Sequence, residues 1–332
     1  MGSGWRIKHF YQTHQPNRKF GDSSVKDIRF GLVIQGPVTS FGNGPNNLKN
    51  GFATYPVIRE NIEVFAPLVD SIVLSTWEGC GITAEQLPGK VNIIENKPID
   101  GFDFLNQKKQ FLTTQSGVDW LKKNSNCTYV LKIRTDQLVP SDLLIWLKNF
   151  YEQSKFHRAN QEDFLIFSEA LKAESFYAGD FIFAGTVNDL SHFCKAVLSA
   201  DRPVHPMNGS DYLLKWLQSL DAKFFSSKSM VAISFLTARN SKAIQSLWDD
   251  VLKTRISLPP RNIYKKIQWR GKPMPSILEA LDTAFFFNEE ICGRAVSAEN
   301  VRSLRKAYKL MREYWKRYLN AKREFKRKEG VE

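Results

Sequence analysis

Four short apolar runs, each followed by polar residues, constrain the fold of this chain more than any other feature. The runs lie at Phe30–Val38, Val69–Leu74, Val91–Ile94 and Tyr129–Ile133, with helices predicted between them at Tyr55–Phe65 and Asn106–Lys123. Near-continuous apolar strands are typical of parallel sheets that are buried on both faces. The alternation of strands and helices therefore predicts an α/β fold with a Rossmann-type, mixed but mostly parallel sheet flanked by helices.

Polar residues follow three of these predicted strands, at the point where each strand ends. They are Gln35-Gly36-Pro37, Ser75-Thr76-Trp77 and Arg134-Thr135-Asp136. The carboxyl ends of parallel strands meet at one edge of the sheet, which is where open α/β sheets bind ligands. The sequence therefore predicts one crevice that collects all three groups.

The rest of the chain divides into a body and two flanking segments. Further strands are predicted at Phe164–Phe167 and Asp180–Phe183, and further helices at Asp142–Tyr151, Leu190–Leu198, Asp211–Leu220 and Ser297–Lys328. We expect an N-terminal arm at residues 1–27, a main domain at 28–240 and a helical C-terminal extension at 241–332.

Charge and cysteine content exclude several classes of protein. The net charge is +13, and +8 of it lies within residues 299–329. The four cysteines are far apart, with no CxxC pair for a zinc ribbon or a disulfide framework. No secretory leader and no apolar run of the ~18–20 residues that span a bilayer is evident. We therefore expect a reduced, cytoplasmic protein.

Asp136 is the candidate metal ligand, because a carboxylate at a strand end is a common way to hold a hard divalent cation beside a diphosphate. The alternative is a turn aspartate before the next helix. Lys109 is a candidate phosphate partner, and Asn106 and Gln110 could fix a sugar or base; a solvated first helical turn is the alternative. Gly36 would let the backbone approach a nucleotide closely, since it lacks a Cβ.

Two acids embedded in apolar sequence are candidates for a general base. Asp180 and Asp211 would both have raised pKa values if they were half-buried. Their structural alternatives are an ion pair with a core arginine for Asp180 and a helix cap for Asp211.

The predicted C-terminal helix combines an apolar stripe with many basic residues. The stripe is Val301, Leu304, Tyr308, Met311, Trp315 and Tyr318. It would pack on the body, or residues 299–328 would attach to an anionic membrane surface, where each basic residue contributes roughly 1 kcal/mol. The body has no nucleic-acid-binding motif, so no nucleic-acid partner is expected.

Five blocks of the sequence, in this order, resemble the WavE-type lipopolysaccharide synthesis family of bacteria, which is similar to GT-A-type glycosyltransferases. The blocks are Val33–Val38, Leu74–Gly79, Asn106–Gly117, Leu131–Asp136 and Asp180–Gly185. The resemblance extends over roughly residues 28–235 and implies a GT-A-like domain.

What the resemblance implies is a nucleotide-sugar site on the residues already singled out. Gln35, Gly36 and Pro37 would contact the nucleotide, with Ser75, Thr76 and Trp77 beside the base and Asn106, Lys109 and Gln110 near the sugar and phosphates. Residues 134–136 stand where many such enzymes carry Asp-x-Asp. Arg134 departs from that pattern, which puts tight metal binding in doubt, and could partly replace a cation as phosphate partner.

The expected reaction transfers a sugar from a nucleotide sugar to a lipopolysaccharide, O-antigen or capsule glycan at the cytoplasmic face of the inner membrane. Mn²⁺ or Mg²⁺ on Asp136 would stabilise the leaving diphosphate. Asp180, or else Asp211, would deprotonate the acceptor hydroxyl if the anomeric centre is inverted. The alternatives are a noncatalytic membrane-surface scaffold and a nucleotidyltransferase-like enzyme.

Removal of residues 299–332 distinguishes the enzyme from the scaffold. The truncated enzyme should keep nucleotide-sugar binding and lose sedimentation with anionic vesicles, because only the basic helix is gone. Thermal shift with nucleotide sugars and vesicle co-sedimentation measure the two properties. Loss of both from a truncated chain that is still folded would favour the scaffold.

Overall fold

The computed structural model describes residues 28–38, 52–99, 101, 103, 106–158, 163–171, 176–200, 208–220, 241–274, 285–286, 316 and 319–328. The predicted arm at residues 1–27 and the predicted apolar stripe of the C-terminal helix lie outside these residues.

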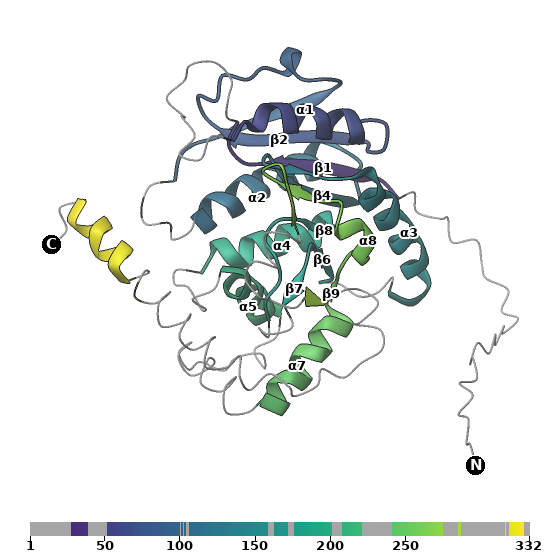
Figure 1. Ribbon diagram of the computed structural model, residues 1–332, viewed down its shortest axis with the longest axis vertical. Helices are drawn as coiled ribbons and strands as arrows, with labels where there is room; N and C mark the ends of the chain where they lie inside the picture. The colour runs from purple at the N-terminus through teal and green to yellow at the C-terminus, as the bar shows by residue number, and fades with distance from the viewer. Residues whose placement is uncertain are drawn as a thin grey trace, which may run out of the picture.

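A seven-stranded, mostly parallel sheet forms the centre of the molecule (Figure 1). Its order is β3-β2-β1-β4-β8-β6-β9, with strands β1 (Phe30–Gln35), β2 (Ser71–Trp77), β3 (Val91–Asn96), β4 (Tyr129–Arg134), β6 (Leu165–Phe167), β8 (Phe183–Thr186) and β9 (Ile256–Ser257). The β1–β2, β2–β3, β1–β4 and β6–β9 pairs are parallel, and only β8 runs against its neighbours. The predicted fold class is confirmed.

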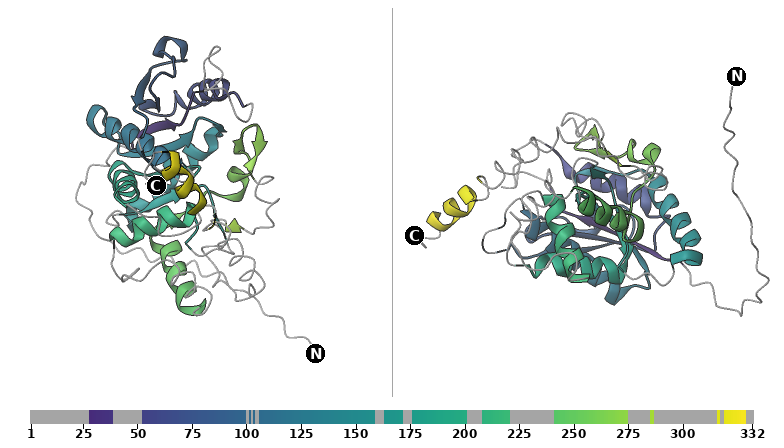
Figure 2. Two further views of the ribbon diagram at one scale, coloured as in Figure 1. Left: turned by 90° about the vertical axis from the view of Figure 1, so that its left-hand side faces the viewer. Right: turned by 90° about the horizontal axis from the view of Figure 1, so that it is seen from below.

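Helices cover both faces of this sheet, as Figures 1 and 2 show. The residues that bury one face come from α1 (Thr54–Phe65), α3 (Ser141–Arg158) and α8 (Arg261–Tyr264). Those that bury the other come from α2 (Gln107–Asn124), α4 (Val187–Leu198), α5 (Asn208–Leu220) and α7 (Ser241–Thr254). A 3₁₀ turn, η1 (Ala84–Gln86), precedes β3.

Helix α2 packs unusually closely on β1, because each element has a glycine at the contact. A Cβ on Gly117 would lie 2.6 Å from Val33, and one on Gly31 would lie 2.6 Å from Leu121. Real side chains do not approach this closely, so both glycines are required by the packing. The first turn of α2 is thereby held at the carboxyl edge of the sheet.

The chain reverses its order across the sheet between β1 and β4. From β1 it builds outward through β2 to β3, and then returns through α2 to place β4 on the other side of β1. In this register Gln35 pairs with Ser75 on one side and with Arg134 on the other. Open α/β sheets bind their ligands at such a switch point, outside the carboxyl ends of the two central strands.

The sheets continue beyond residue 240, where the sequence predicts a domain boundary. Strand β9 pairs with β6 in the main sheet. Strand β10 (Gln268–Trp269) pairs with both β5 (Gln137–Leu138) and β11 (Lys272–Pro273), and β12 (Phe285–Phe286) pairs with β7 (Ala170–Leu171). Segments on both sides of residue 240 therefore belong to one folded unit.

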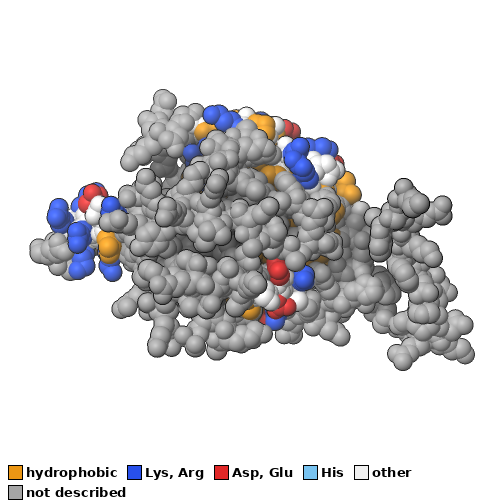
Figure 3. Space-filling view, turned by 60° about the horizontal axis from the view of Figure 1, so that its bottom comes forward, with side chains coloured by type: hydrophobic (Ala, Val, Ile, Leu, Met, Phe, Trp, Pro, Cys, Tyr) orange, Lys and Arg blue, Asp and Glu red, His pale blue; other side chains and the backbone are white. Residues whose placement is uncertain are grey.

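The described part of the C-terminal helix, residues 319–328, exposes most of its side chains and contains no buried residue. Lys322, Arg323, Lys326, Arg327 and Lys328 make it strongly basic, and Figure 3 shows its blue side chains. No described helix is both long and apolar enough to cross a membrane. Attachment to an anionic surface stays a prediction.

Candidate functional site

The ends of β1, β2 and β4 meet at one edge, as the sequence predicts. The backbone N–H of Gly36 donates to Ser75 O at 3.1 Å, and that of Thr135 donates to Gln35 O at 3.0 Å. Gly36 has φ +133°, and a Cβ there would lie 2.6 Å from Thr135 Oγ1. The close approach that needs a glycine is therefore to Thr135, which corrects the expectation that Gly36 is open to a nucleotide.

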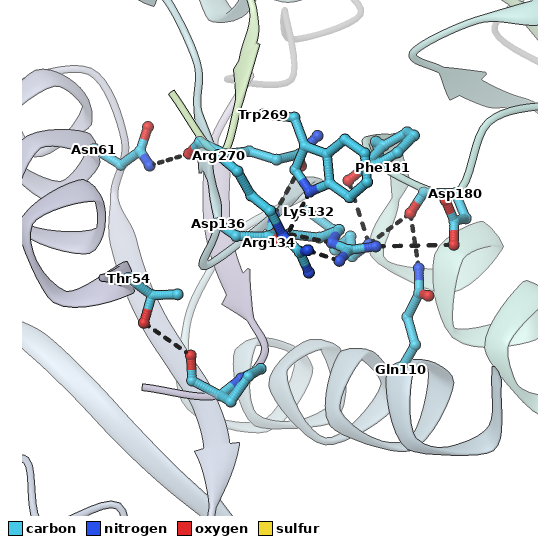
Figure 4. Close-up of polar contacts among 12 residues, drawn as sticks. Thr54, Asn61, Gln110, Lys132, Arg134, Asp136, Asp180, Phe181, Trp269 and Arg270 are labelled. Atoms are coloured by element: carbon cyan, nitrogen blue, oxygen red, sulfur yellow. Dashed lines mark hydrogen bonds and ion pairs between the residues drawn. The ribbon is translucent and has the colours of Figure 1, made fainter. Parts of the chain in front are cut away.

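Arg134 and Asp136 form a bidentate ion pair at the end of β4 (Figure 4). Arg134 Nε donates to Asp136 Oδ1 at 2.9 Å, and Nη2 donates to Oδ2 at 3.1 Å. The third nitrogen, Nη1, lies 4.0 Å from Oδ2 of Asp180. The side chains of Arg134 and Asp180 are 24% and 19% exposed, so molecules in solution can reach the space between them.

Two residues far along the chain complete the contacts of Asp136. Trp269 Nε1 donates to Oδ2 at 2.8 Å and Arg270 Nε at 3.1 Å, while the Arg270 backbone N–H donates to Asp136 O at 2.9 Å. The Arg270 guanidinium lies 4.9 Å from the centre of the Trp269 ring. Sequence analysis missed both residues, because the two-residue strands β10 and β11 carry no apolar periodicity.

These contacts do not fit the predicted metal site on Asp136. Its two oxygens accept four hydrogen bonds, one on Oδ1 and three on Oδ2, and three of the four come from cationic guanidinium groups. Burial raises the pKa of Asp136, but attraction to Arg134 and the bonds from Arg134, Trp269 and Arg270 outweigh it and hold the pKa below its usual range. No described cluster of three or more His, Cys, Asp or Glu side chains could hold a metal ion. Metal binding by Asp136 therefore stays a prediction that this geometry does not favour.

Asp180 belongs to an irregular segment, Ala178–Phe181, rather than to the predicted strand Asp180–Phe183. Gln110 Nε2 donates to Asp180 O at 2.7 Å, Lys132 Nζ donates to the same oxygen at 3.0 Å and to Phe181 O at 3.3 Å, and Tyr212 Oη donates to Ala178 O. Because side chains satisfy these carbonyls, strand β8 begins only at Phe183. Gln110, predicted to bind sugar, instead positions Asp180.

Lys132 is a fully buried lysine within the apolar run that forms β4. Its ammonium group lies 4.4 Å from the centre of the Phe183 ring, in addition to the two carbonyl contacts. Burial and the nearby Arg134 lower its pKa to about 7, against the smaller opposing effect of Asp180. The lysine that holds the segment carrying Asp180 is therefore protonated in only part of the molecules near neutral pH.

Glu169 lies behind the same segment. The Gly179 N–H donates to its backbone oxygen at 2.7 Å, and a Cβ on Gly179 would lie 1.8 Å from Glu169 Oε1. Burial raises the pKa of Glu169 to about 8, so its carboxyl group is mostly protonated at neutral pH. Only a glycine at position 179 leaves room for this group beside Asp180.

Asp211, the other predicted base, forms a buried ion pair with Lys215. Lys215 Nζ lies 2.8 Å from Asp211 Oδ2 and 3.0 Å from Gln107 Oε1, and the two paired side chains are 3% and 5% exposed. This pair joins α5 to the first turn of α2. The prediction of Asp211 as a base is corrected on this geometry, and Asp180 is the remaining candidate.

The other predicted site residues differ in exposure. Ser75 and Thr76 are fully buried, and Asn96 Nδ2 donates to Ser75 Oγ at 3.0 Å and to Thr76 O at 2.8 Å, so they build the edge rather than face a ligand. Trp77 and Lys109 are half-buried, whereas Pro37 and Asn106 are exposed.

Helix α2 begins with its backbone N–H groups already satisfied. The Asp103 carboxylate accepts the N–H groups of Lys108 and Lys109 at 2.8 and 3.0 Å. Asn106 precedes the helix in the left-handed conformation, with φ 57°. The half-buried side chain of Lys109 is thereby placed at the carboxyl edge of the sheet.

No family model and no curated protein sequence matches the chain. Similar solved structures include 4-diphosphocytidyl-2C-methyl-D-erythritol synthase from Anaerococcus prevotii, with 11% identity and a TM-score of 0.35 over 57% of this chain and 83% of that one. Mannose-1-phosphate geranyltransferase from Thermus thermophilus has 12% identity and a TM-score of 0.33 over 56% of this chain and 67% of that one. A cytidylyltransferase from Leptospira borgpetersenii has 14% identity and a TM-score of 0.33 over 66% of this chain and 97% of that one. Similarity this low assigns no function.

The lowered pKa of Lys132 makes stability depend on pH. Between pH 7 and 10.5 the unfolded chain binds the lysine proton more tightly than the folded one, so the free energy of unfolding should rise with pH, by at most about 1.4 kcal/mol per unit. Lys132→Met should lack this part of the slope, whereas Lys122→Met, at an exposed position on α2, should retain it. Urea unfolding across this range measures the slope, and equal slopes in all three proteins would contradict the account.

Proposed function

We propose that this protein is a nucleotide-sugar-dependent glycosyltransferase whose donor binds in the crevice at the carboxyl edge, between β1 and β4. The observation that supports the proposal most is the meeting of the Arg134–Asp136 ion pair and Asp180 at the point where strand order reverses. Ligand sites of open α/β sheets form at such points. A fixed cation and a carboxylate side by side there supply the two kinds of group that a group-transfer reaction needs.

The two charged groups suit the two halves of a sugar transfer. The transfer leaves a nucleotide phosphate with growing negative charge, which a fixed guanidinium stabilises without rearrangement. The same reaction takes a proton from an acceptor hydroxyl. Asp180 is about one-fifth exposed, and its backbone carbonyl oxygen accepts hydrogen bonds from Gln110 and Lys132, so it can accept that proton in a fixed position.

Lys109 and Trp77 extend the proposed donor site on either side. Trp77 is half-buried at the end of β2 and offers an aromatic face beside a nucleotide base. Lys109 is half-buried in the first turn of α2 and adds a positive charge near the phosphates or sugar.

The acceptor and the place of reaction are proposed from the sequence. The resemblance to the WavE-type family supports a lipopolysaccharide, O-antigen or capsule glycan as the acceptor. The basic side chains of residues 319–328 support attachment to an anionic membrane surface, which would bring a glycolipid acceptor to the crevice. The cytoplasmic face of the inner membrane is the proposed location.

Asp180→Asn tests the proposal, because an amide cannot accept the proton. Incubated with a panel of nucleotide sugars and rough lipopolysaccharide, this variant should release nucleotide about 10²–10⁴-fold more slowly and bind the donor nearly as well. Asp142→Asn, which alters an exposed carboxylate on α3 paired with Lys266, is the matched control and should react normally.

Three outcomes separate the alternatives. An Asp180→Asn protein with the normal rate would remove Asp180 from the chemistry. Release of pyrophosphate from a nucleoside triphosphate and a sugar 1-phosphate would show a nucleotidyltransferase instead. Absence of binding by any nucleotide or nucleotide sugar in the panel would contradict the proposed function as a whole.

A further inference from the structure

The carboxylate of Asp136 accepts one hydrogen bond on Oδ1 and three on Oδ2 from donors that belong to the protein. Two of its four donor groups come from Arg134, one from Arg270 and one from Trp269, and its side chain is 9% exposed. Ca²⁺ prefers six or more oxygen ligands, and Mg²⁺ prefers near-octahedral coordination by oxygen. To reach Asp136, either cation would have to approach two guanidinium groups of its own sign and compete with their hydrogen bonds.

The positive charge that a metal would bring is already present in these guanidinium groups. Asp136 fixes Arg134 through its Nε edge, and fixes Arg270 through both its Nε and its backbone N–H. Trp269 lies against the Arg270 guanidinium at 4.9 Å and against that of Arg134 at 5.9 Å. Both cations are therefore positioned before any ligand arrives, which lowers the entropy lost on binding.

Arg134 has one nitrogen left for a ligand. Its Nη1 is 4.0 Å from Asp180 Oδ2, and among the described residues no acceptor lies within hydrogen-bonding distance of it. The side chains of Arg134 and Arg270 are 24% and 39% exposed, so a phosphate can reach both from solution. Arginine matches phosphate oxygens with directed hydrogen bonds and keeps its charge at all physiological pH values.

We infer that the diphosphate of the donor is held by the guanidinium groups of Arg134 and Arg270 without a divalent cation, and that Asp136 is the positioning residue for both. This inference rests on the proposed function and names how its site holds phosphate. The two positive charges stand where the resemblance alone would place a metal ion.

Isothermal titration of the full-length protein with UDP, GDP, CDP and inorganic pyrophosphate, first in excess EDTA and then in Mn²⁺, tests the inference. At least one of these probes should bind in EDTA, with a dissociation constant that Mn²⁺ changes by no more than about twofold. Arg134→Ala should weaken this binding about 10- to 100-fold, since it removes hydrogen bonds to a charged group. The affinity of Arg134→Lys should lie between those of the unaltered protein and Arg134→Ala, because lysine keeps the charge and loses the directed pair of donors.

Arg59→Ala is the matched control. Arg59 is an exposed arginine on α1 that pairs with Glu63, so its loss should leave binding unchanged. Circular dichroism shows whether each variant is folded, and the EDTA comparison on the unaltered protein gives a result even if Arg134→Ala does not fold.

The failures of the two proposals are distinguishable. Binding that appears only with Mn²⁺ would overturn the metal-free site and leave the proposed function standing. EDTA-resistant binding that Arg134→Ala does not weaken would overturn the assignment to these arginines. Absence of binding by all four probes under both conditions would overturn both.

Discussion

Two of the four hydrogen bonds to the Asp136 carboxylate come from residues 133 and 134 positions further along the chain. They attach the β10–β11 hairpin to the end of β4, and the β10–β5 pairing strengthens the same connection. Each hydrogen bond to a charged group contributes about 1.5–3 kcal/mol. Loss of this carboxylate would remove the negative charge that it places against two partly buried guanidinium groups, so the geometry at this edge of the sheet depends on it.

A second set of contacts holds the other side of the crevice. Backbone carbonyls of Ala178–Phe181 accept bonds from side chains on three different elements: Gln110 on α2, Lys132 on β4 and Tyr212 on α5. These anchors come from regular elements with buried cores, so the irregular segment is fixed as well as a strand would be. Rigid backbone near a reacting group is a condition for fast transfer, because it sets the distance to the substrate in advance.

Much of the fold could be predicted from the sequence, because buried parallel strands are nearly continuous apolar runs. The runs around Val33, Leu74 and Leu131 became neighbouring parallel strands, and the polar residues after them meet at one edge. The predicted strand Asp180–Phe183 is not formed over its first residues. Side chains of Gln110 and Lys132 donate hydrogen bonds to the backbone carbonyls there, in place of a neighbouring strand. The continuation of the sheets beyond residue 240 left no signal in the sequence, because β9 and β10 are too short to show periodicity.

The composition of the site was less predictable. Arg134 and Asp136 are visible as a motif, but their partners Trp269 and Arg270 are not, since a pairing across more than 130 residues leaves no local pattern. The ion pair of Asp211 can be predicted from the sequence, because Lys215 follows it by four residues, the spacing of a helical ion pair. Aspartates in similar sequence contexts thus differ in their possible roles, because the fold pairs each of them with a different cation.

Hydrogen–deuterium exchange with and without a bound nucleotide tests most directly where the ligand lies. We expect slower exchange in peptides that cover residues 134–137, 178–181 and 268–272, since all three segments surround the same guanidinium and carboxylate groups. Exchange in α7, far along the core on the opposite face from α1, should be unaffected. Protection confined to α7 or to the C-terminal helix, with no change at residues 134–137, would contradict a crevice centred on Arg134 and Asp136.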